Sequence, residues 1–143
     1  MFDSNLPTRF IEIDSHKIAY YRTGEGPPMV LLHGITTSSF IWRRLIPALG
    51  QDFDVIAIDL LGCGDSDKPA GVDYSILAQA RLIRRLLAGL ALEKAHFVTH
   101  DIGGGIGQIM AVNRIVENSP GDTLEGKLIP LCTCFPAARI MQP

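Results

Sequence analysis

Asp101 is the residue of this sequence whose type and position are best suited to chemistry. It follows the apolar run 96–99 and precedes the glycine-dense stretch 102–107, and this order predicts a buried strand, a sharp turn and a helix. An aspartate has an ordinary pKa of about 3.9, so its carboxylate is ionised at neutral pH and can attack an electrophile without a base to activate it. The N-terminus of the following helix would favour the same negative charge. We therefore interpret Asp101 as a candidate nucleophile.

The residues on either side of Asp101 bear on that interpretation. A turn this tight requires one small residue two positions before the nucleophile and another two positions after it. Gly103 meets the second requirement, whereas Thr99 meets the first less well because it is β-branched. A simpler interpretation is that Asp101 only caps the helix and that the glycines only allow the helix to pack closely against the strand.

A second turn would supply hydrogen-bond donors to the same site. His33 and Gly34 directly follow residues 29–32, a short apolar run typical of a central parallel strand. The turn after such a strand provides one backbone N–H that stabilises an oxyanion, and the residue after the nucleophile provides another. The two donors would be the N–H groups of Ile35 and Ile102. The remaining members of the two turns are candidate supporting residues: His33, Gly34, His100 and Gly103.

Alternating elements indicate an α/β fold that would position these turns. Period-2 patterns and short apolar runs predict strands over residues 10–13, 17–21, 29–32, 54–59 and 96–99. Apolar residues at helical spacing predict helices over 40–49 and 73–90 and a third after Asp101. This order predicts a mostly parallel sheet with helices on both faces and an antiparallel N-terminal hairpin.

The regular pattern weakens after Val112. We expect residues 1–112 to form a partial α/β core and residues 113–143 to form a divergent tail. Residues 127–135 are compatible with one further strand, although Pro130 has no N–H for a central ladder. A sheet without its later strands would expose an edge strand with unpaired backbone N–H and C=O groups. We therefore also expect self-association through that strand.

Composition narrows the classes of function. The 143 residues include 13 basic and 15 acidic side chains, a net charge of -2, which gives no electrostatic case for binding nucleic acid or an anionic membrane. No stretch approaches the length of a membrane span, and the N-terminus lacks the features of a signal peptide. Cys63, Cys132 and Cys134 have the spacing of neither a zinc site nor a disulfide framework. We expect a cytoplasmic protein without metal or cofactor that acts on a small-molecule substrate.

Three runs together resemble the first half of an α/β-hydrolase. They are 31–43 (LLHGITTSSFIWR), 59–69 (DLLGCGDSDKP) and 100–104 (HDIGG). More narrowly, residues 10–112 resemble the aspartate-nucleophile branch that contains haloalkane dehalogenases and epoxide hydrolases. The resemblance implies that Asp101 attacks a carbon atom of a small alkyl halide or epoxide and forms an alkyl-enzyme ester. A histidine-activated water would then hydrolyse that ester.

The sequence departs from that branch in two ways. Dehalogenases of this kind usually hold the leaving halide with an Asn and a Trp where this chain has Ile35 and Ile102, which disfavours a halide site of that type. In the superfamily the triad acid and histidine follow the nucleophile, whereas every histidine here precedes Asp101: His16, His33, His96 and His100. We therefore expect a truncated hydrolase without the triad acid, its histidine or a cap domain, which forms one covalent adduct without turnover.

Two other interpretations remain open. In the first, the chain is a non-catalytic remnant or frameshifted fragment, and the change of pattern near Val112 marks the break. In the second, it is a nucleotide-binding α/β module whose residues 103–107 surround a phosphate. The dinucleotide fingerprint requires G-x-G-x-x-G, but its last glycine would fall on Gln108 or Met110, which disfavours the second interpretation.

Overall fold

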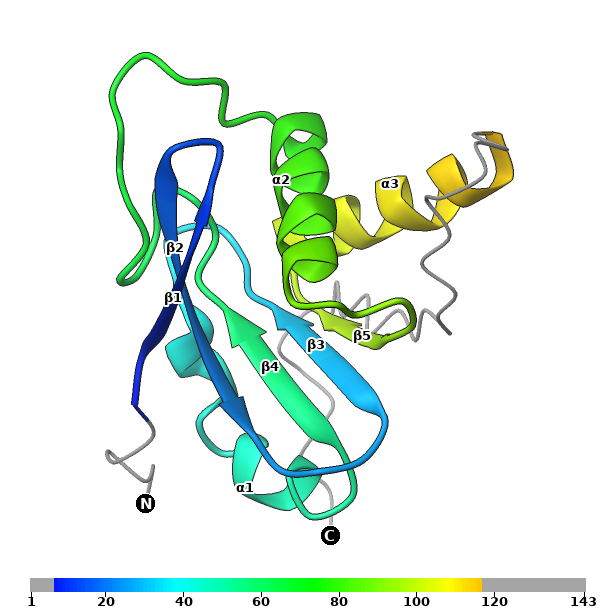
Figure 1. Ribbon diagram of the computed structural model, residues 1–143. Coiled ribbons are helices and arrows are strands. Elements are labelled where there is room, and N and C mark those ends of the chain that lie inside the picture. Colours follow the sequence, from blue (N-terminus) through cyan, green and yellow to red (C-terminus); the bar gives the residue numbers. More distant parts are fainter. Residues whose placement is uncertain (1–6, 117–143) are drawn as a thin grey trace, which may run out of the picture.

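The computed structural model describes residues 7–116, which form a five-stranded sheet with covering helices (Figure 1). The strand order is β1-β2-β4-β3-β5. The strands are β1 Arg9–Ile13, β2 His16–Thr23, β3 Pro28–Leu32, β4 Asp54–Ile58 and β5 His96–Thr99. β1 pairs antiparallel with β2 and β2 antiparallel with β4, whereas β3 pairs parallel with both β4 and β5. The predicted α/β fold with an antiparallel N-terminal hairpin is confirmed, and its sheet is mixed.

The hairpin turn and the length of β2 have separate causes. Asp14 and Ser15 have φ values of 51° and 63°, the left-handed conformation that matches the twist of a two-residue hairpin. β2 runs to Thr23, past the expected residues 17–21, because its second half pairs with β4. Periodicity predicts that a strand exists, but it does not reveal which distant strand lengthens it by pairing.

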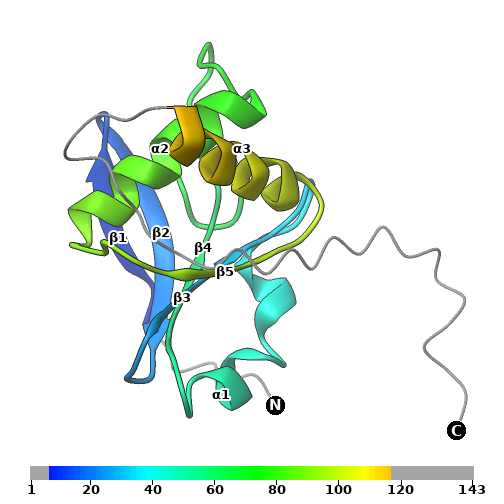
Figure 2. The ribbon, with the colours of Figure 1, turned by 90° about the vertical axis from the view of Figure 1, so that its right-hand side faces the viewer.

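Helices cover both faces of the sheet, as the sequence predicts (Figure 2). One face is covered by α2 (Ile76–Gly89) and α3 (Ile102–Val116). The other face is covered by a short 3-10 helix, η1 (Ser39–Trp42), and by α1 (Ile46–Leu49). The core under η1 and α1 contains Met29, Leu31, Trp42, Ile46, Val55, Ala57 and Val98. Because Val30 and Leu32 belong to the opposite core, β3 is buried on both faces, which explains its continuous apolar run.

The prediction of one helix over residues 40–49 is wrong, because the structure has two short helices there. η1 ends at Trp42, and α1 begins at Ile46 with Pro47 in its first turn. A proline has no N–H to donate, and its ring would clash with the carbonyl group four residues earlier, that of Arg43. One continuous helix therefore cannot pass through this position, although the two short helices share one core.

The other helix boundaries shift more modestly. α2 begins at Ile76 rather than at residue 73, because the Ser75 hydroxyl caps it by accepting the N–H of Ala78 at 3.2 Å. α3 continues to Val116, past the point where the apolar pattern weakens. Most of the predicted tail 113–143, including the strand predicted over 127–135, lies outside the described residues.

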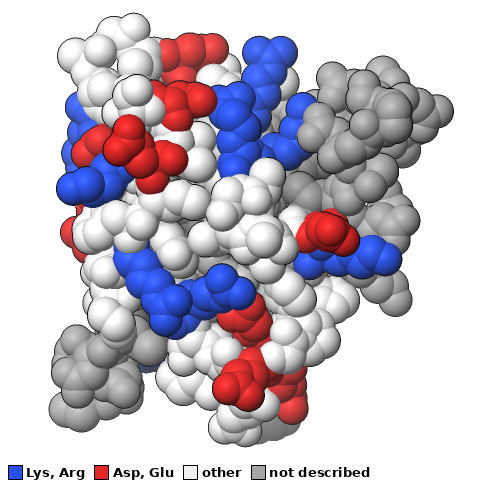
Figure 3. Space-filling view, in the orientation of Figure 1, with Lys and Arg blue, Asp and Glu red and all other residues white. Residues whose placement is uncertain are grey.

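The face of the molecule in Figure 3 has no large patch of one charge. Lys and Arg side chains are interspersed with Asp and Glu side chains across this face, as a net charge of -2 would lead one to expect. In the part of the chain that the structure describes, no helix has the length and hydropathy needed to cross a membrane.

Candidate active site

Asp101 occupies a strained turn between β5 and α3. Its φ is 54°, a left-handed conformation that few non-glycine residues adopt and that often marks functional sites. The turn brings the start of α3 against the end of β3. A Cβ atom on Gly103 would lie 2.5 Å from the carbonyl oxygen of Leu32 and 2.8 Å from that of His33. Only glycine allows this approach, which is the physical reason for a small residue at this position.

A backbone N–H from the second turn binds the Asp101 carboxylate. The N–H of Ile35 donates a 2.8 Å hydrogen bond to Oδ2 of Asp101. Gly34 makes the approach possible, since a Cβ atom there would lie 2.6 Å from Cβ of Asp101 and 2.8 Å from Nδ1 of His100. The structure therefore brings Asp101, Ile35, Gly34 and His100 together around one point.

The N–H of Ile102 is the other donor predicted from the sequence. The next two N–H groups of α3 bind the turn itself, because Gly103 donates to the carbonyl of His100 and Gly104 donates to that of Asp101. No hydrogen bond among residues 7–116 engages the N–H of Ile102. As a free donor at a helix N-terminus, it is available to a group bound beside Asp101.

His33 faces the core rather than the site. Its side chain is fully buried, and its Nε2 accepts the N–H of Leu60 at 3.0 Å. The proton of the neutral ring must then sit on Nδ1, which lies 2.8 Å from the carbonyl oxygen of Gly34. Burial lowers the pKa of His33, and the hydrogen bond to Gly34 only partly opposes this effect. His33 therefore links the end of β3 to the loop after β4 and has no nitrogen free to act as a base.

A buried carboxylate that the sequence analysis did not single out holds the neighbouring loop. Asp59 follows β4 and is 2% exposed. Its Oδ1 accepts the N–H of Ser39 at 2.7 Å, and its Oδ2 accepts the N–H of Asp65 at 2.8 Å. Gly64 lies so close that a Cβ atom there would be 2.0 Å from Oδ2 of Asp59. An Asp directly after a buried strand and before a glycine-rich loop was the signal for this role, because a buried carboxylate must find backbone donors.

Two large apolar side chains are exposed on segments that contact the Asp101 turn or α3. The side chain of Ile35 is 62% exposed, and that of Ile76 is 41% exposed. Ile76 approaches Gly105 in the first turn of α3, where a Cβ atom would lie 3.2 Å from Cδ1 of Ile76. Gly103 and Gly105 therefore allow α3 to pack closely against β3 and α2. Among residues 7–116, no cluster of His, Cys, Asp or Glu side chains could hold a metal ion.

Residues 27–118 match the family described as alpha/beta hydrolase fold, and the chain belongs to this family. The Soluble epoxide hydrolase of Corynebacterium sp. (strain C12) is 36% identical to it over 128 residues, 83% of this chain and 44% of that protein. Haloalkane dehalogenase 2 of Mycobacterium tuberculosis (strain ATCC 25618 / H37Rv) is 37% identical over 130 residues, 84% of this chain and 46% of that protein.

The fold is also found in solved structures. A crystal structure of a membrane phospholipase A, described as a bacterial virulence factor, matches with a TM-score of 0.75 and 28% identity, over 86% of this chain and 39% of that chain. The chain thus spans less than half the length of each of these three proteins. The three names differ in substrate, so family membership alone does not decide the reaction.

Proposed function

We propose that Asp101 is a nucleophile that attacks an electrophilic carbon atom and forms an aspartyl ester. The observation that carries this proposal is the hydrogen bond from the N–H of Ile35 to Oδ2 of Asp101. The backbone of Asp101 has a left-handed φ, and the residue lies in an exposed turn. A helix cap would use its carboxylate on the first N–H groups of its own helix. Here the carboxylate instead binds an N–H group from another strand connection.

The hydrogen bond to Oδ2 supports different roles for the two carboxylate oxygens. Oδ2 is held by Ile35, so Oδ1 is the atom left to attack the carbon. A new C–O bond forms while the bond to the leaving group breaks with its electron pair, giving a halide ion or, from an epoxide, an alkoxide that takes a proton from water. Oδ2 then becomes the ester carbonyl oxygen, already bonded to the N–H of Ile35. If water attacks the ester, the charge that develops on Oδ2 is stabilised by this N–H and that of Ile102.

The second half of the reaction needs a base to activate water. His33 cannot supply it, since both of its ring nitrogens are engaged. The other histidines of the chain also precede Asp101, unlike the order in this superfamily, where the histidine follows the nucleophile. We propose that Asp101 and its turn perform the ester-forming step, and that the base of the hydrolytic step is a group other than His33.

The proposed substrates are small organic electrophiles with an apolar body. Two observations support this class: the names of two relatives, an epoxide hydrolase and a haloalkane dehalogenase, and the exposed apolar side chains of Ile35 and Ile76. Within it epoxides are favoured over alkyl halides, because the side chains of Ile35 and Ile102 cannot donate a hydrogen bond to a leaving halide.

The test is the intact mass of the full chain after incubation with styrene oxide or 1-bromobutane. We expect a mass increase of one substrate-derived group, located on Asp101 by peptide mapping, which also separates it from alkylation of thiols such as Cys63. Asp101→Asn should abolish this adduct and leave the thiol adducts unchanged. A folded protein that gives no Asp101 adduct would instead support a non-catalytic remnant. Continuous release of diol that depends on Asp101 would show that another group of the protein activates water for the hydrolytic step.

A further inference from the structure

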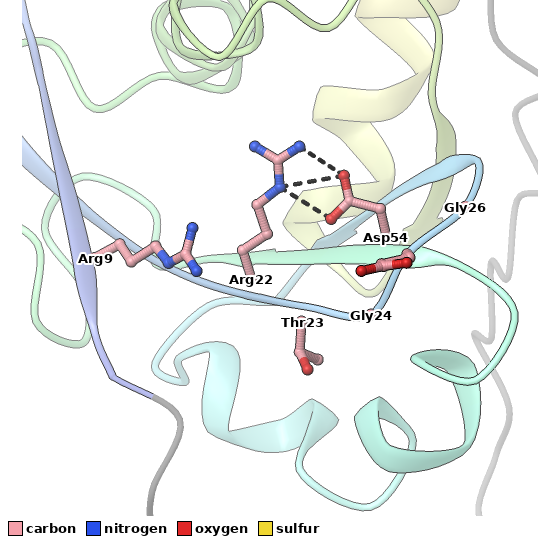
Figure 4. Close-up of a pocket in the computed structure, with 7 residues that line it drawn as sticks. Arg9, Arg22, Thr23, Gly24, Gly26 and Asp54 are labelled. Atoms are coloured by element: carbon pink, nitrogen blue, oxygen red, sulfur yellow. Dashed lines mark hydrogen bonds and ion pairs between the residues drawn. The ribbon is translucent and has the colours of Figure 1, made fainter.

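A second site lies at the edge of the sheet opposite to Asp101. It is a pocket of about 580 Å³ lined by Arg9, Arg22, Thr23, Gly24, Glu25, Gly26 and Asp54 (Figure 4). Asp54 begins β4, whereas Asp101 follows the end of β5. Since β3, β4 and β5 are parallel, the beginnings of these strands lie at one edge of the sheet and their ends at the other. The pocket is therefore separate from the candidate active site.

Arg22 presents one fixed cationic group to this pocket. Its Nε donates to both carboxylate oxygens of Asp54 at 2.9 and 3.1 Å, and its Nη2 donates to Oδ2 at 2.7 Å. The two side chains are only 30% and 13% exposed, and the hydrogen bond to Asp54 raises the pKa of Arg22. This pairing uses one edge of the planar guanidinium group. Nη1 has no hydrogen-bond partner among residues 7–116, which leaves it available to a ligand.

Arg9 brings a second cation to the same face. In the β1–β2 pairing Arg9 lies opposite Tyr20, and Arg22 is two residues further along β2, so both arginines project from the same side of the sheet. Figure 4 shows Arg9 extending from β1 toward β2 on the side of the pocket where Arg22 lies. Within residues 7–116 no hydrogen bond or ion pair engages the guanidinium group of Arg9. Its charge is not neutralised by a described neighbour, unlike that of Arg22.

The loop that closes the pocket is held rigidly. Gly24 and Gly26 have φ values of 85° and 127°, which side chains other than glycine rarely adopt. A Cβ atom on Gly24 would lie 2.2 Å from the carbonyl oxygen of Phe53, and one on Gly26 would lie 2.6 Å from that of Asp52. The loop therefore packs tightly against the backbone before β4. A pocket with a preformed wall loses little entropy when a ligand binds.

We propose that this pocket binds an oxyanion, the carboxylate or phosphate group of a small ligand, between Arg9 and the free Nη1 of Arg22. A guanidinium group whose orientation is already set by Asp54 offers a fixed N–H direction, and planar guanidinium groups suit carboxylate and phosphate oxygens. Glu25 also lines the pocket and repels an anion, which predicts modest affinity. The opposite signs of Arg9 and Glu25 make the proposal testable with a matched pair of variants.

The experiment titrates the full chain with inorganic phosphate and, separately, with malonate, each compared with sodium chloride at equal ionic strength. The readouts are the melting temperature and the ¹⁵N-¹H signals of the arginine Nε groups. We expect saturable stabilisation and a shift of the Arg22 Nε signal. Arg9→Gln should weaken binding about tenfold, because it removes a charge-assisted hydrogen bond, while Glu25→Gln should strengthen it.

The outcomes separate the possible ligands. A response to phosphate alone identifies a phosphate-bearing ligand, a response to malonate alone identifies a carboxylate, and a response to both supports a general oxyanion site. A response equalled by chloride, or unchanged by Arg9→Gln, overturns the proposal. Weaker binding in Glu25→Gln would also overturn it, because the pocket would then require a cationic group in its ligand. Asp101→Asn should leave all of these results unchanged, so the two sites can fail independently.

Discussion

The backbone N–H of Ile35 and the Oδ2 atom of Asp101 are joined by a 2.8 Å hydrogen bond across 66 residues of sequence. The two residues meet because β3 and β5 are parallel neighbours whose last residues, Leu32 and Thr99, lie side by side. The segments that follow β3 and β5 then turn at the same edge of the sheet. The bond holds Oδ2 of the carboxylate, so Oδ1 is the oxygen that would attack in the proposed reaction.

Removing this donor should therefore impair ester formation. Ile35→Pro deletes the N–H. The proline ring should fit at this position, because the side chain of Ile35 is exposed and the preceding residue, Gly34, is flexible. We expect the rate of adduct formation at Asp101 to fall by about 10- to 100-fold, because the attacking oxygen is no longer held in position. Time-resolved intact mass measures this rate. Ile35→Val keeps the N–H and should react at close to the original rate; equal losses in both variants would assign the effect to the side chain.

Glycines around the turn should differ in their tolerance of a methyl group. The new Cβ atom of Gly103→Ala would lie 2.5 Å from a carbonyl oxygen of β3, and since that strand is buried on both faces it cannot yield. We expect a loss of about 2–3 kcal/mol in the free energy of unfolding. In Gly104→Ala the nearest atom is Thr99 Oγ1 at 3.9 Å, so this control should gain about 0.5–1 kcal/mol from reduced chain entropy. Urea denaturation of both variants checks the contrast.

Gly34→Ala should displace Asp101 from the N–H of Ile35. Its Cβ atom would lie 2.6 Å from Cβ of Asp101, and because the backbone fixes the position of that Cβ atom, the turn at Asp101 must shift. We expect a stability loss of about 1–3 kcal/mol together with the loss of most adduct formation, because Asp101 moves away from the N–H of Ile35. A variant that reacts normally would show that this orientation of Asp101 is not needed.

The strands and the turn at Asp101 can be predicted from local sequence signals. The distant residues that pair with them cannot. The apolar runs at β3, β4 and β5 reflect burial on two faces, so each strand is visible in its own residues. The extension of β2 to Thr23 depends on β4, and the role of Asp59 depends on N–H groups of Ser39 and Asp65 brought there by the fold. Apolar spacing predicts one helix over residues 40–49, but Pro47 interrupts it locally because a proline disfavours a helical turn before it.

The same limit applies to the site. The two turns after apolar runs indicate Asp101, Ile35 and Ile102, since these positions follow strand ends that meet at one edge of the sheet. It could not show that His33 faces the core. A histidine in a turn has the same type and spacing whether it binds substrate or braces the backbone, and only the hydrogen bonds to Leu60 and Gly34 distinguish the two.

Two ion pairs should contribute unequally to stability. Asp54→Asn breaks the pairing with partly buried Arg22, which involves three short hydrogen bonds, and should cost about 1–2 kcal/mol. Asp14→Asn breaks the exposed pair with Arg85. This second change should be neutral or slightly stabilising, because Asn readily adopts the left-handed φ of 51° at position 14. Similar losses in the two variants would show that geometry and burial do not set the difference.

His33 should make the fold sensitive to mild acid. Burial holds the pKa of His33 below its ordinary value of 6.5, so its ring stays neutral in the folded protein at a pH where the unfolded chain already binds a proton. The stabilisation is complete above about pH 6.5 and is lost as the pH falls toward the lowered pKa of the folded state. Below that lowered pKa both states carry the proton, and the contribution of His33 stops changing.

The comparison that isolates this effect is His33→Gln. The glutamine amide can accept an N–H and donate to a carbonyl but does not titrate, so the variant loses packing without gaining a charge in acid. We expect it to be less stable than the original chain at about pH 7.5, with a difference that narrows toward about pH 5.5. Urea midpoints at several pH values measure both curves. If the two curves remain parallel across this range, the acid sensitivity comes from another group, and His33 tolerates a proton in the folded state.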